Sequence, residues 1–333
     1  MAVAQRRGTA GPTPKPANRD YSATLQPEPP MHNRSLAAIG YLCLGILVFS
    51  LQDLILKDLS GVYPVTQAMT VRSIVALPIL LVLVHVGGFR LRSRNAGLLV
   101  LRACMSFGAY LSYYMALAAL PMADVVALFF IGPLYITALG IVVLGEHPHR
   151  STFAALFIGI VGVVVTLRPG SGLFEWASLL SLLAAVLYGS AQIVARKMGE
   201  GEGAAVMTFY QNFAFLVGAP ALAFVFGGDA ASGLHPSIGF LTRPWSWPPA
   251  VDLALMAACG VIAAAGMTLL SQAYRLAPAG NLSVFEYSAI LWAPLWGFLF
   301  FGEIPRVTTV VGAALICGAG LFALRSAERR RDG

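Results

Sequence analysis

Asp53, Arg72 and Glu286 are ionisable residues inside apolar stretches that are long enough to cross a membrane. An ionisable side chain in the bilayer costs roughly 2.5–3.5 kcal/mol on insertion scales, so it usually faces a partner or water. Arg72 lies about 12 Å from one end of its stretch, at 1.5 Å per residue, and Asp53 lies toward the same face at a shallower depth. We therefore expect Arg72 to pair with Asp53 or to attract a substrate anion. The alternative is a structural ion pair that only joins two helices.

Glu286 lies about 9 Å from the opposite face on the same rise, and Gln192 and Asn212 fall at a similar depth. Burial favours the protonated form of a carboxyl group, so Glu286 is a candidate for taking up a coupling proton. The alternative is a carboxylate that hydrogen-bonds neighbouring helices and never titrates. Aromatic side chains near these groups can stack on a flat or cationic ligand. The predicted substrate-binding residues are Gln52, Asp53, Arg72, Tyr114, Gln192, Asn212, Glu286, Tyr287 and Trp292.

The composition indicates that these residues lie on membrane-spanning helices. The 333-residue chain is 58% hydrophobic and 11% charged, whereas soluble domains carry roughly 25% charged residues. Its apolar runs are continuous and match the length of about 20 residues that a spanning helix needs, and they lack the alternating pattern of a membrane β-barrel. The sequence predicts an all-α polytopic membrane protein with ten transmembrane helices near 36–56, 64–86, 97–119, 123–144, 151–167, 176–196, 206–227, 251–274, 280–301 and 307–324.

The net charge of +7 reflects membrane topology and does not indicate a nucleic-acid partner. With the N-terminus inside, 16 of the 22 Lys and Arg residues fall in inner segments, four in outer segments and two within spans. This excess is the positive-inside bias. It predicts a multi-pass protein of the bacterial inner (plasma) membrane with both termini in the cytoplasm. Residues 1–35 are expected to form a disordered cytoplasmic tail, and residues 326–333 a basic cytoplasmic tail.

The sequence also contains an internal repeat. Five residues recur 157 positions later and three near the first span recur 140 positions later, a difference that an insertion near 228–250 explains. The matches join Pro121, Gly145, Glu146, Pro148 and Arg168 to Pro278, Gly302, Glu303, Pro305 and Arg325, and Ser50, Gln52 and Lys57 to Ser190, Gln192 and Lys197. The halves are then 36–168 and 176–325. Each holds five spans, an odd number, so the halves face opposite ways, as in secondary transporters with a site near the midplane.

Two groups of residues in corresponding parts of the halves resemble a known family. The first is Leu120-Pro121-Met122-Ala123-Asp124, Pro133, Gly145-Glu146 and Leu167-Arg168-Pro169-Gly170; the second is Phe285-Glu286-Tyr287, Leu291-Trp292-Ala293 and Phe301-Gly302-Glu303. Each resembles one EamA module, and together they resemble an EamA-type transporter of the drug/metabolite transporter superfamily over about residues 36–325. The resemblance implies ten helices around a central cavity and alternating access. It also implies substrates such as amino acids, their derivatives, S-adenosylmethionine, riboflavin or drugs.

One position departs from this pattern. Ile290 stands where the first half has Pro133, and Pro294 follows four residues later. We therefore expect the helix break in the ninth span to be displaced. The recurring Glu146 and Glu303 each follow a glycine at the end of a span, where a carboxylate is expected to cap the first turn of the next helix.

Several motifs do not occur in the sequence. There is no GxxxxGK[ST] phosphate loop, which excludes an ATP-driven pump within this chain. The sequence contains neither an HExxH motif nor a CxxC spacing, and either of these would have indicated a metal site. We expect no catalytic residues, no cofactor and no metal.

These observations predict a secondary active transporter of a small organic metabolite, namely an amino acid or derivative, an S-adenosylmethionine-like or a vitamin-like solute. The alternative is a broad-specificity drug/metabolite exporter. An intramembrane enzyme would need a compact catalytic set at one depth, and a channel would need rings of like groups or carbonyl filters; neither pattern is visible. The expected partners are the small-molecule substrate and the lipid bilayer, and the chain is expected to be a monomer or homodimer.

Overall fold

The computed structural model describes residues 31–88, 91, 93, 95–145, 150–168, 175–198, 203–228, 234–276 and 285–328, and all regular secondary structure in these ranges is helical. The helices are α1 (Met31–Leu59), α2 (Val65–Val86), α3 (Ala96–Ala119), α4 (Met122–Phe129), α5 (Gly132–Leu144), α6 (Arg150–Leu167), α7 (Ala177–Met198), α8 (Ala204–Phe226), α9 (Pro236–Thr242), α10 (Ala250–Leu276), α12 (Ala289–Phe301) and α13 (Val307–Glu328). Because α1 begins at Met31, the last five residues of the expected N-terminal tail are helical. Residues 1–30, 280–284 and 329–333, together with Glu146 and Pro148, lie outside the described residues.

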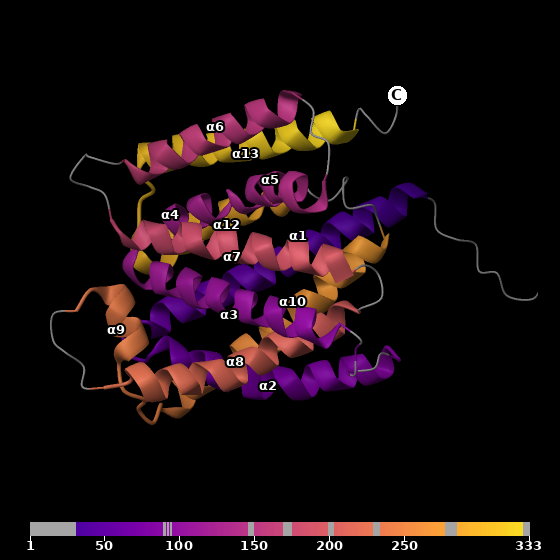
Figure 1. Cartoon of the computed structure of the whole chain (residues 1–333). Helices are drawn as coiled ribbons and strands as arrows, with labels where there is room; N and C mark the ends of the chain where they lie inside the picture. The colour runs from indigo at the N-terminus through magenta and orange to yellow at the C-terminus, as the bar shows by residue number, and fades with distance from the viewer. Residues whose placement is uncertain are drawn as a thin grey trace, which may run out of the picture.

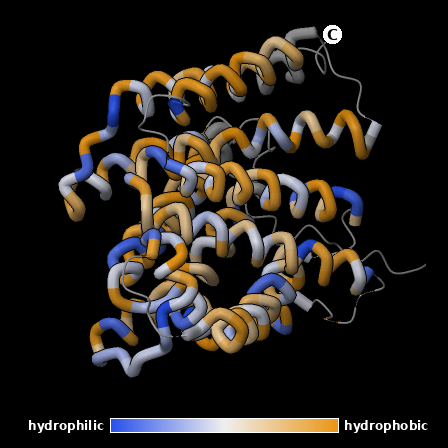
Figure 2. The backbone as a smooth tube through the Cα atoms, turned by 60° about the vertical axis from the view of Figure 1, so that its left-hand side comes forward, coloured by the Kyte–Doolittle hydropathy of each residue, from blue (hydrophilic) through white to orange (hydrophobic). Residues whose placement is uncertain are grey.

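The described helices have the length and composition of a multi-pass membrane protein. Seven stretches are long and apolar enough to cross a bilayer, and three shorter apolar helices cover Phe153–Leu167, Ala289–Phe301 and Val307–Phe322. The shorter helices fall at the fifth, ninth and tenth expected spans. Hydrophobic residues predominate along the helices and hydrophilic ones gather near their ends (Figure 2). Large apolar side chains such as Val142 and Phe224 are exposed on the outside of the bundle, where lipid would cover them.

The long helices run roughly side by side, with the start of α1 and the end of α13 at one end of the bundle and α9 at the other (Figure 1). We call the latter the α9 end; it includes residues 59–65, 119–122 and 302–307. The most extensive packing joins α1 to α10, α3 to α7, α2 to α8 and α6 to α13, and α4 packs on α12. Each of these contacts joins a helix of residues 36–168 to a helix of residues 176–325.

Two helix breaks, in the fourth and ninth expected spans, lie 157 positions apart, which is the offset of the sequence repeat. Phe130 and Ile131 separate α4 from α5, and Tyr287 and Ser288, 157 positions later, form the turn before α12. The expected displacement of the second break is therefore wrong. Pro294 lies inside α12 without ending it, because a membrane helix can absorb a proline when its neighbours satisfy the freed backbone groups.

The two breaks also contact each other. The rings of Phe130 and Tyr287 have centroids 5.3 Å apart. The helices that follow the breaks both end at a glycine with left-handed backbone, Gly145 at φ 67° and Gly302 at φ 64°. Glycine is favoured there because it lacks the Cβ that makes this conformation costly.

The packing of α6 on α13 depends on small residues. A Cβ added at Gly162 would lie 2.8 Å from the Ile316 side chain and 2.9 Å from the Gly312 carbonyl oxygen. Small residues allow membrane helices to approach this closely. Ala155 and Ala319, both almost fully buried, lie farther along the same two helices.

Candidate substrate-binding site

Arg72 is a fully buried cation held between aromatic rings. Its side chain projects from α2, and its guanidinium carbon lies 5.4 Å from the ring centroid of Tyr110 on α3 and 5.4 Å from that of Phe215 on α8. Such contacts stabilise a cation by about 0.5–2 kcal/mol each. Its Nε and Nη1 atoms are buried and have no hydrogen-bond partner in the protein. The guanidinium group is thus fixed in place while two of its nitrogens remain unpaired.

Asp53 does not form the expected ion pair with Arg72. Both residues are described, and no nitrogen–oxygen distance of 4 Å or less joins them; Asp53 instead accepts a hydrogen bond of 2.9 Å from the Tyr113 hydroxyl. The carboxylate still acts on Arg72 electrostatically. A negative and a positive group therefore lie near each other without neutralising one another by contact.

Gln52 and Tyr114 extend this cluster. The Gln52 Nε2 atom donates to the Tyr114 hydroxyl over 2.7 Å, and both side chains are buried. The Gln52 Oε1 atom is buried and has no partner. Four of the predicted residues, Gln52, Asp53, Arg72 and Tyr114, are therefore brought together around the tyrosines of α3, and we call these four the Arg72 cluster.

A continuous row of aromatic rings runs from Arg72 across the bundle. Successive centroids lie between 5.2 and 5.8 Å apart, in the range of favourable aromatic pairs. The row, which we call the aromatic row, consists of Phe215, Tyr110, Tyr114, Tyr113, Phe129 and Tyr188. Sequence reasoning selected only Tyr114 from it. The spacing of Tyr110, Tyr113 and Tyr114 at i, i+3 and i+4 is the signal that places all three on one face of a helix.

Three further polar residues lie near the two ends of the aromatic row, Gln192 and Glu286 near Tyr188 and Asn212 near Phe215. Tyr188 interacts electrostatically with Glu286, and its hydroxyl interacts with the Gln192 side chain one turn away on α7. Asn212 lies one turn from Phe215 on α8, where its Nδ2 atom donates to the Thr208 carbonyl oxygen over 3.0 Å. The buried Asn212 Oδ1 atom has no partner. Gln192, Glu286 and Asn212 are thus linked to the first cluster through the aromatic row.

Arg102 is a polar residue of this region that sequence reasoning did not select. It is 7% exposed on α3, and its Nη1 atom donates to the Met207 carbonyl oxygen over 3.3 Å. It interacts electrostatically with Tyr188 and Tyr110. Arg102, like Arg72, is a charged residue within an apolar span, and this could have identified it as a candidate from the sequence.

Tyr287 and Trp292 lie in a different setting from the other predicted residues. Tyr287 packs on Phe130 at the helix breaks, and its buried hydroxyl has no partner. Trp292 stacks on Trp296 with centroids 6.0 Å apart, and Trp296 in turn donates to the Ser50 hydroxyl over 2.9 Å. Tyr287 therefore contacts the break between α4 and α5, and Trp292 packs on the tryptophan that joins α12 to α1. Within the described ranges, no three His, Cys, Asp or Glu side chains are grouped as metal ligands.

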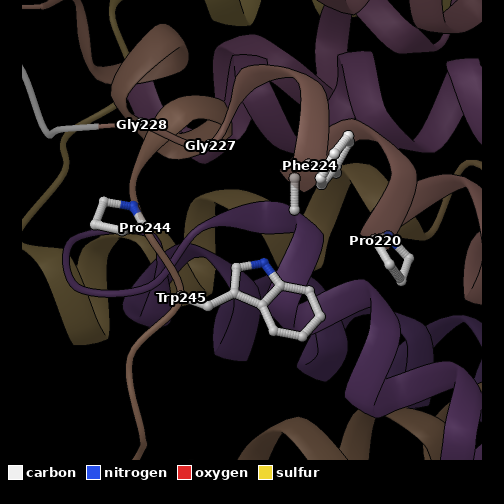
Figure 3. A pocket seen from close by; sticks show the side chains of 7 residues that line it. Pro220, Phe224, Gly227, Gly228, Pro244 and Trp245 are labelled. Carbon is white, nitrogen blue, oxygen red and sulfur yellow. The ribbon is translucent and has the colours of Figure 1, made fainter.

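A surface groove of about 630 Å³ lies apart from these charged residues. It is lined by α8 and by the segment that leads to α10, including Pro220, Phe224, Pro244 and Trp245 (Figure 3). The Trp245 indole nitrogen donates to the Thr66 hydroxyl over 3.0 Å. Its lining is apolar and open, so it offers no charged group that would select a solute.

The part of the chain that the structure describes includes seven stretches long and apolar enough to cross a bilayer, which is the architecture of a multi-pass membrane protein. Comparison with known families agrees: the model of the EamA-like transporter family matches residues 36–168 and 175–325. The chain belongs to the EamA-like transporter family.

Relatives with assigned names are transporters. The chain is 24% identical over 275 residues to the pseudopaline exporter CntI of Pseudomonas aeruginosa, covering 82% of this chain and 90% of the relative. It is 29% identical over 214 residues to a riboflavin transporter of Rhizobium johnstonii, covering 64% and 65%, and 24% identical over 295 residues to an S-adenosylmethionine uptake transporter of Rickettsia bellii, covering 87% and 94%. A solved crystal structure shares the fold, with a TM-score of 0.59 at 16% identity over 90% of this chain and 98% of the other.

Proposed function

We propose that this protein is a secondary active transporter that moves a small organic metabolite bearing an anionic group across the bacterial inner membrane. The observation that carries the proposal is the Arg72 guanidinium, fully buried, held between two rings and left with two unpaired nitrogens. A buried cation without a contacting counter-ion is costly. An anionic solute would supply the missing acceptors and lower that cost when it binds.

The architecture proposed for this function is ten spans in two inverted five-helix repeats, residues 36–168 and 176–325. The segments that the family model matches support this division. So does the contact between Phe130 and Tyr287, which are equivalent residues of the two repeats. Under an inverted repeat, α1 on α10 and α3 on α7 are equivalent pairs. The charge asymmetry of the sequence supports a cytoplasmic location for both termini.

The polar groups support a solute with more than one recognition element. Arg72 would bind its anionic group, and Asp53, Gln52 and Asn212 present acceptors for a cationic or donor group. The aromatic row would stack on any flat part. An amino acid or a derivative of one, or an S-adenosylmethionine-like solute, has both kinds of charge. A vitamin-like solute would depend mainly on the rings.

Glu286 is proposed to couple transport to protons. It interacts electrostatically with Tyr188, the last residue of the aromatic row. Because a carboxyl group in a low-dielectric site favours its protonated form, solute and proton occupancy would be linked there. The second candidate function is a broad-specificity exporter of flat cations. The length of the aromatic row favours it, because aromatic rings stack on such solutes.

The test is transport by the purified protein in proteoliposomes. Saturable uptake of a labelled solute that is accelerated by the same unlabelled solute on the other side is expected of a carrier. Flux without saturation or counterflow would indicate a channel, and chemical conversion of the solute or of a lipid would indicate an enzyme. Either outcome contradicts the proposal. Thermal-shift screening finds the solute first, because a bound ligand raises apparent stability.

A further inference from the structure

Lys57 occupies a position where several elements meet at the α9 end. It lies in the last turn of α1, one helical turn beyond Asp53, with a side chain that is 10% exposed. Its Nζ atom donates to the carbonyl oxygens of Leu117, at 3.3 Å, and Leu120, at 2.6 Å. These are carbonyl groups at the C-terminus of α3, which carries the negative end of the helix dipole.

Glu303 holds Lys57 from the other repeat. Its Oε1 atom lies 2.7 Å from the Lys57 Nζ atom. Its Oε2 atom accepts a hydrogen bond of 2.9 Å from the Met122 backbone N–H, the first residue of α4. The expectation that Glu303 caps the helix after it is therefore wrong, because its carboxylate caps α4 instead. Asp124, in the first turn of α4, also accepts a hydrogen bond from Thr309 of α13.

This cluster crosses a boundary between two tightly packed helix pairs. α1 packs extensively on α10, and α3 packs extensively on α7, whereas α1 and α3 make only limited contact with each other. Asp53 on α1 and Tyr113 on α3 approach each other across this boundary. Lys57 and Leu117 lie one turn farther toward the α9 end, about 6 Å at 1.5 Å per residue. On α1 and α3 they therefore lie between the Asp53–Tyr113 contact and the α9 end.

We propose that Lys57 is a gate residue, which closes the substrate site toward the α9 end by joining α1 to α3 and Glu303 and must leave this position for solute to pass. The inference rests on the proposed transport function and adds a named closing contact to it. Both charges are largely buried, so separating them without water is costly. Water that enters as α1 and α3 part hydrates both charges, which couples breakage of the ion pair to opening.

The repeat partner of Lys57 has a different environment. Lys197, 140 positions later, lies near the C-terminal end of α7 and is exposed. The same residue type at equivalent positions is thus buried at the α9 end and exposed at the other end. This difference fits a conformation that is closed toward the α9 end, and it makes Lys197 a matched control.

The test measures the distance between spin labels at Val62, after α1, and Leu179, in the first turn of α7, which are 59% and 51% exposed. The protein has its four native cysteines replaced by alanine and is placed in lipid nanodiscs. Lys57→Met and Glu303→Gln are each expected to raise the ratio of a longer-distance population to the closed one by about tenfold, because removing one partner of a buried pair destabilises the paired state. Lys197→Met is expected to leave the distribution unchanged.

Glu303→Gln keeps an acceptor for the Met122 N–H, so it decides the question if Lys57→Met does not fold. An unchanged distance distribution in the folded Glu303→Gln protein would overturn the proposal and leave the ion pair as a static contact. A shift of equal size in Lys197→Met would overturn it as well. Because the measurement needs no solute, a failure of solute exchange in the unsubstituted protein would count against the transport function and not against the gate.

Discussion

Replacing Arg72 with methionine should remove transport while making the folded protein more stable. Methionine has a similar length and no polar atoms to bury. The substitution therefore separates a residue kept for solute binding from one kept for the fold. If Arg72 served the fold, its loss would destabilise the protein.

The magnitude follows from the contacts of the guanidinium group. Its two unpaired buried donors each cost about 1–3 kcal/mol. The ring contacts with Tyr110 and Phe215 stabilise the buried guanidinium group by about 0.5–2 kcal/mol each. The difference favours methionine by about 1–2 kcal/mol at the middle of these ranges, which corresponds to an increase of a few degrees in unfolding temperature. Natural sites commonly give up stability in this way for function.

The assay combines thermal unfolding of the purified protein without solute and counterflow in proteoliposomes. Arg72→Met should unfold at a higher temperature, lose counterflow of an anion-bearing solute by at least about 100-fold, and lose the stabilisation that the solute gives the unsubstituted protein. Arg72→Lys serves as the control, because it keeps the charge and loses the planar group. A variant that is destabilised by more than 1 kcal/mol and still transports would refute the reasoning and assign Arg72 to the fold.

Three further predictions follow from the described contacts. Asp53→Asn keeps an oxygen that accepts from Tyr113, so the protein should fold normally while its affinity for a cationic solute falls about tenfold or more, as a binding titration would measure; unchanged affinity would remove Asp53 from the site. Glu286→Gln should keep solute exchange but lose accumulation driven by a pH gradient, because the amide takes up no proton; gradient-driven accumulation by this variant would contradict the coupling role. Gly162→Val should destabilise the packing of α6 on α13 by about 1–3 kcal/mol, seen as a lower unfolding temperature, whereas Gly40→Val, where no atom lies within 4 Å of an added Cβ, should have little effect.

The positions of the helices were predictable because hydropathy is a local property of the sequence. Expected and observed helices agree within a few residues for most of the chain: 64–86 against Val65–Val86, and 97–119 against Ala96–Ala119. The break before α12 was not predictable from proline positions. It lies at Tyr287 and Ser288, where there is no proline and where Tyr287 packs against Phe130.

The sequence singled out some residues of the candidate site but not their contacts. Arg72 could be found because any charge in an apolar span is conspicuous. Its two ring partners could not, since Tyr110 and Phe215 come from α3 and α8 and ordinary packing uses the same residue types. Glu303 shows the same limit: the sequence indicates a capping carboxylate, but only the tertiary structure shows that it caps α4.

The contact between Phe130 and Tyr287 has a consequence for the energetics of a transport cycle. In a perfectly duplicated molecule this position would meet its own copy, and the two states of the proposed cycle, open to either side, would be related by a two-fold rotation and equal in free energy. Here the two residues differ by one oxygen atom, which is buried without a partner and lies against Gly320. Exchanging the roles of the halves moves that hydroxyl into a different environment. Under the proposed cycle the two end states would therefore be unequal in free energy, with a bias toward one resting state that originates where the two helix breaks meet.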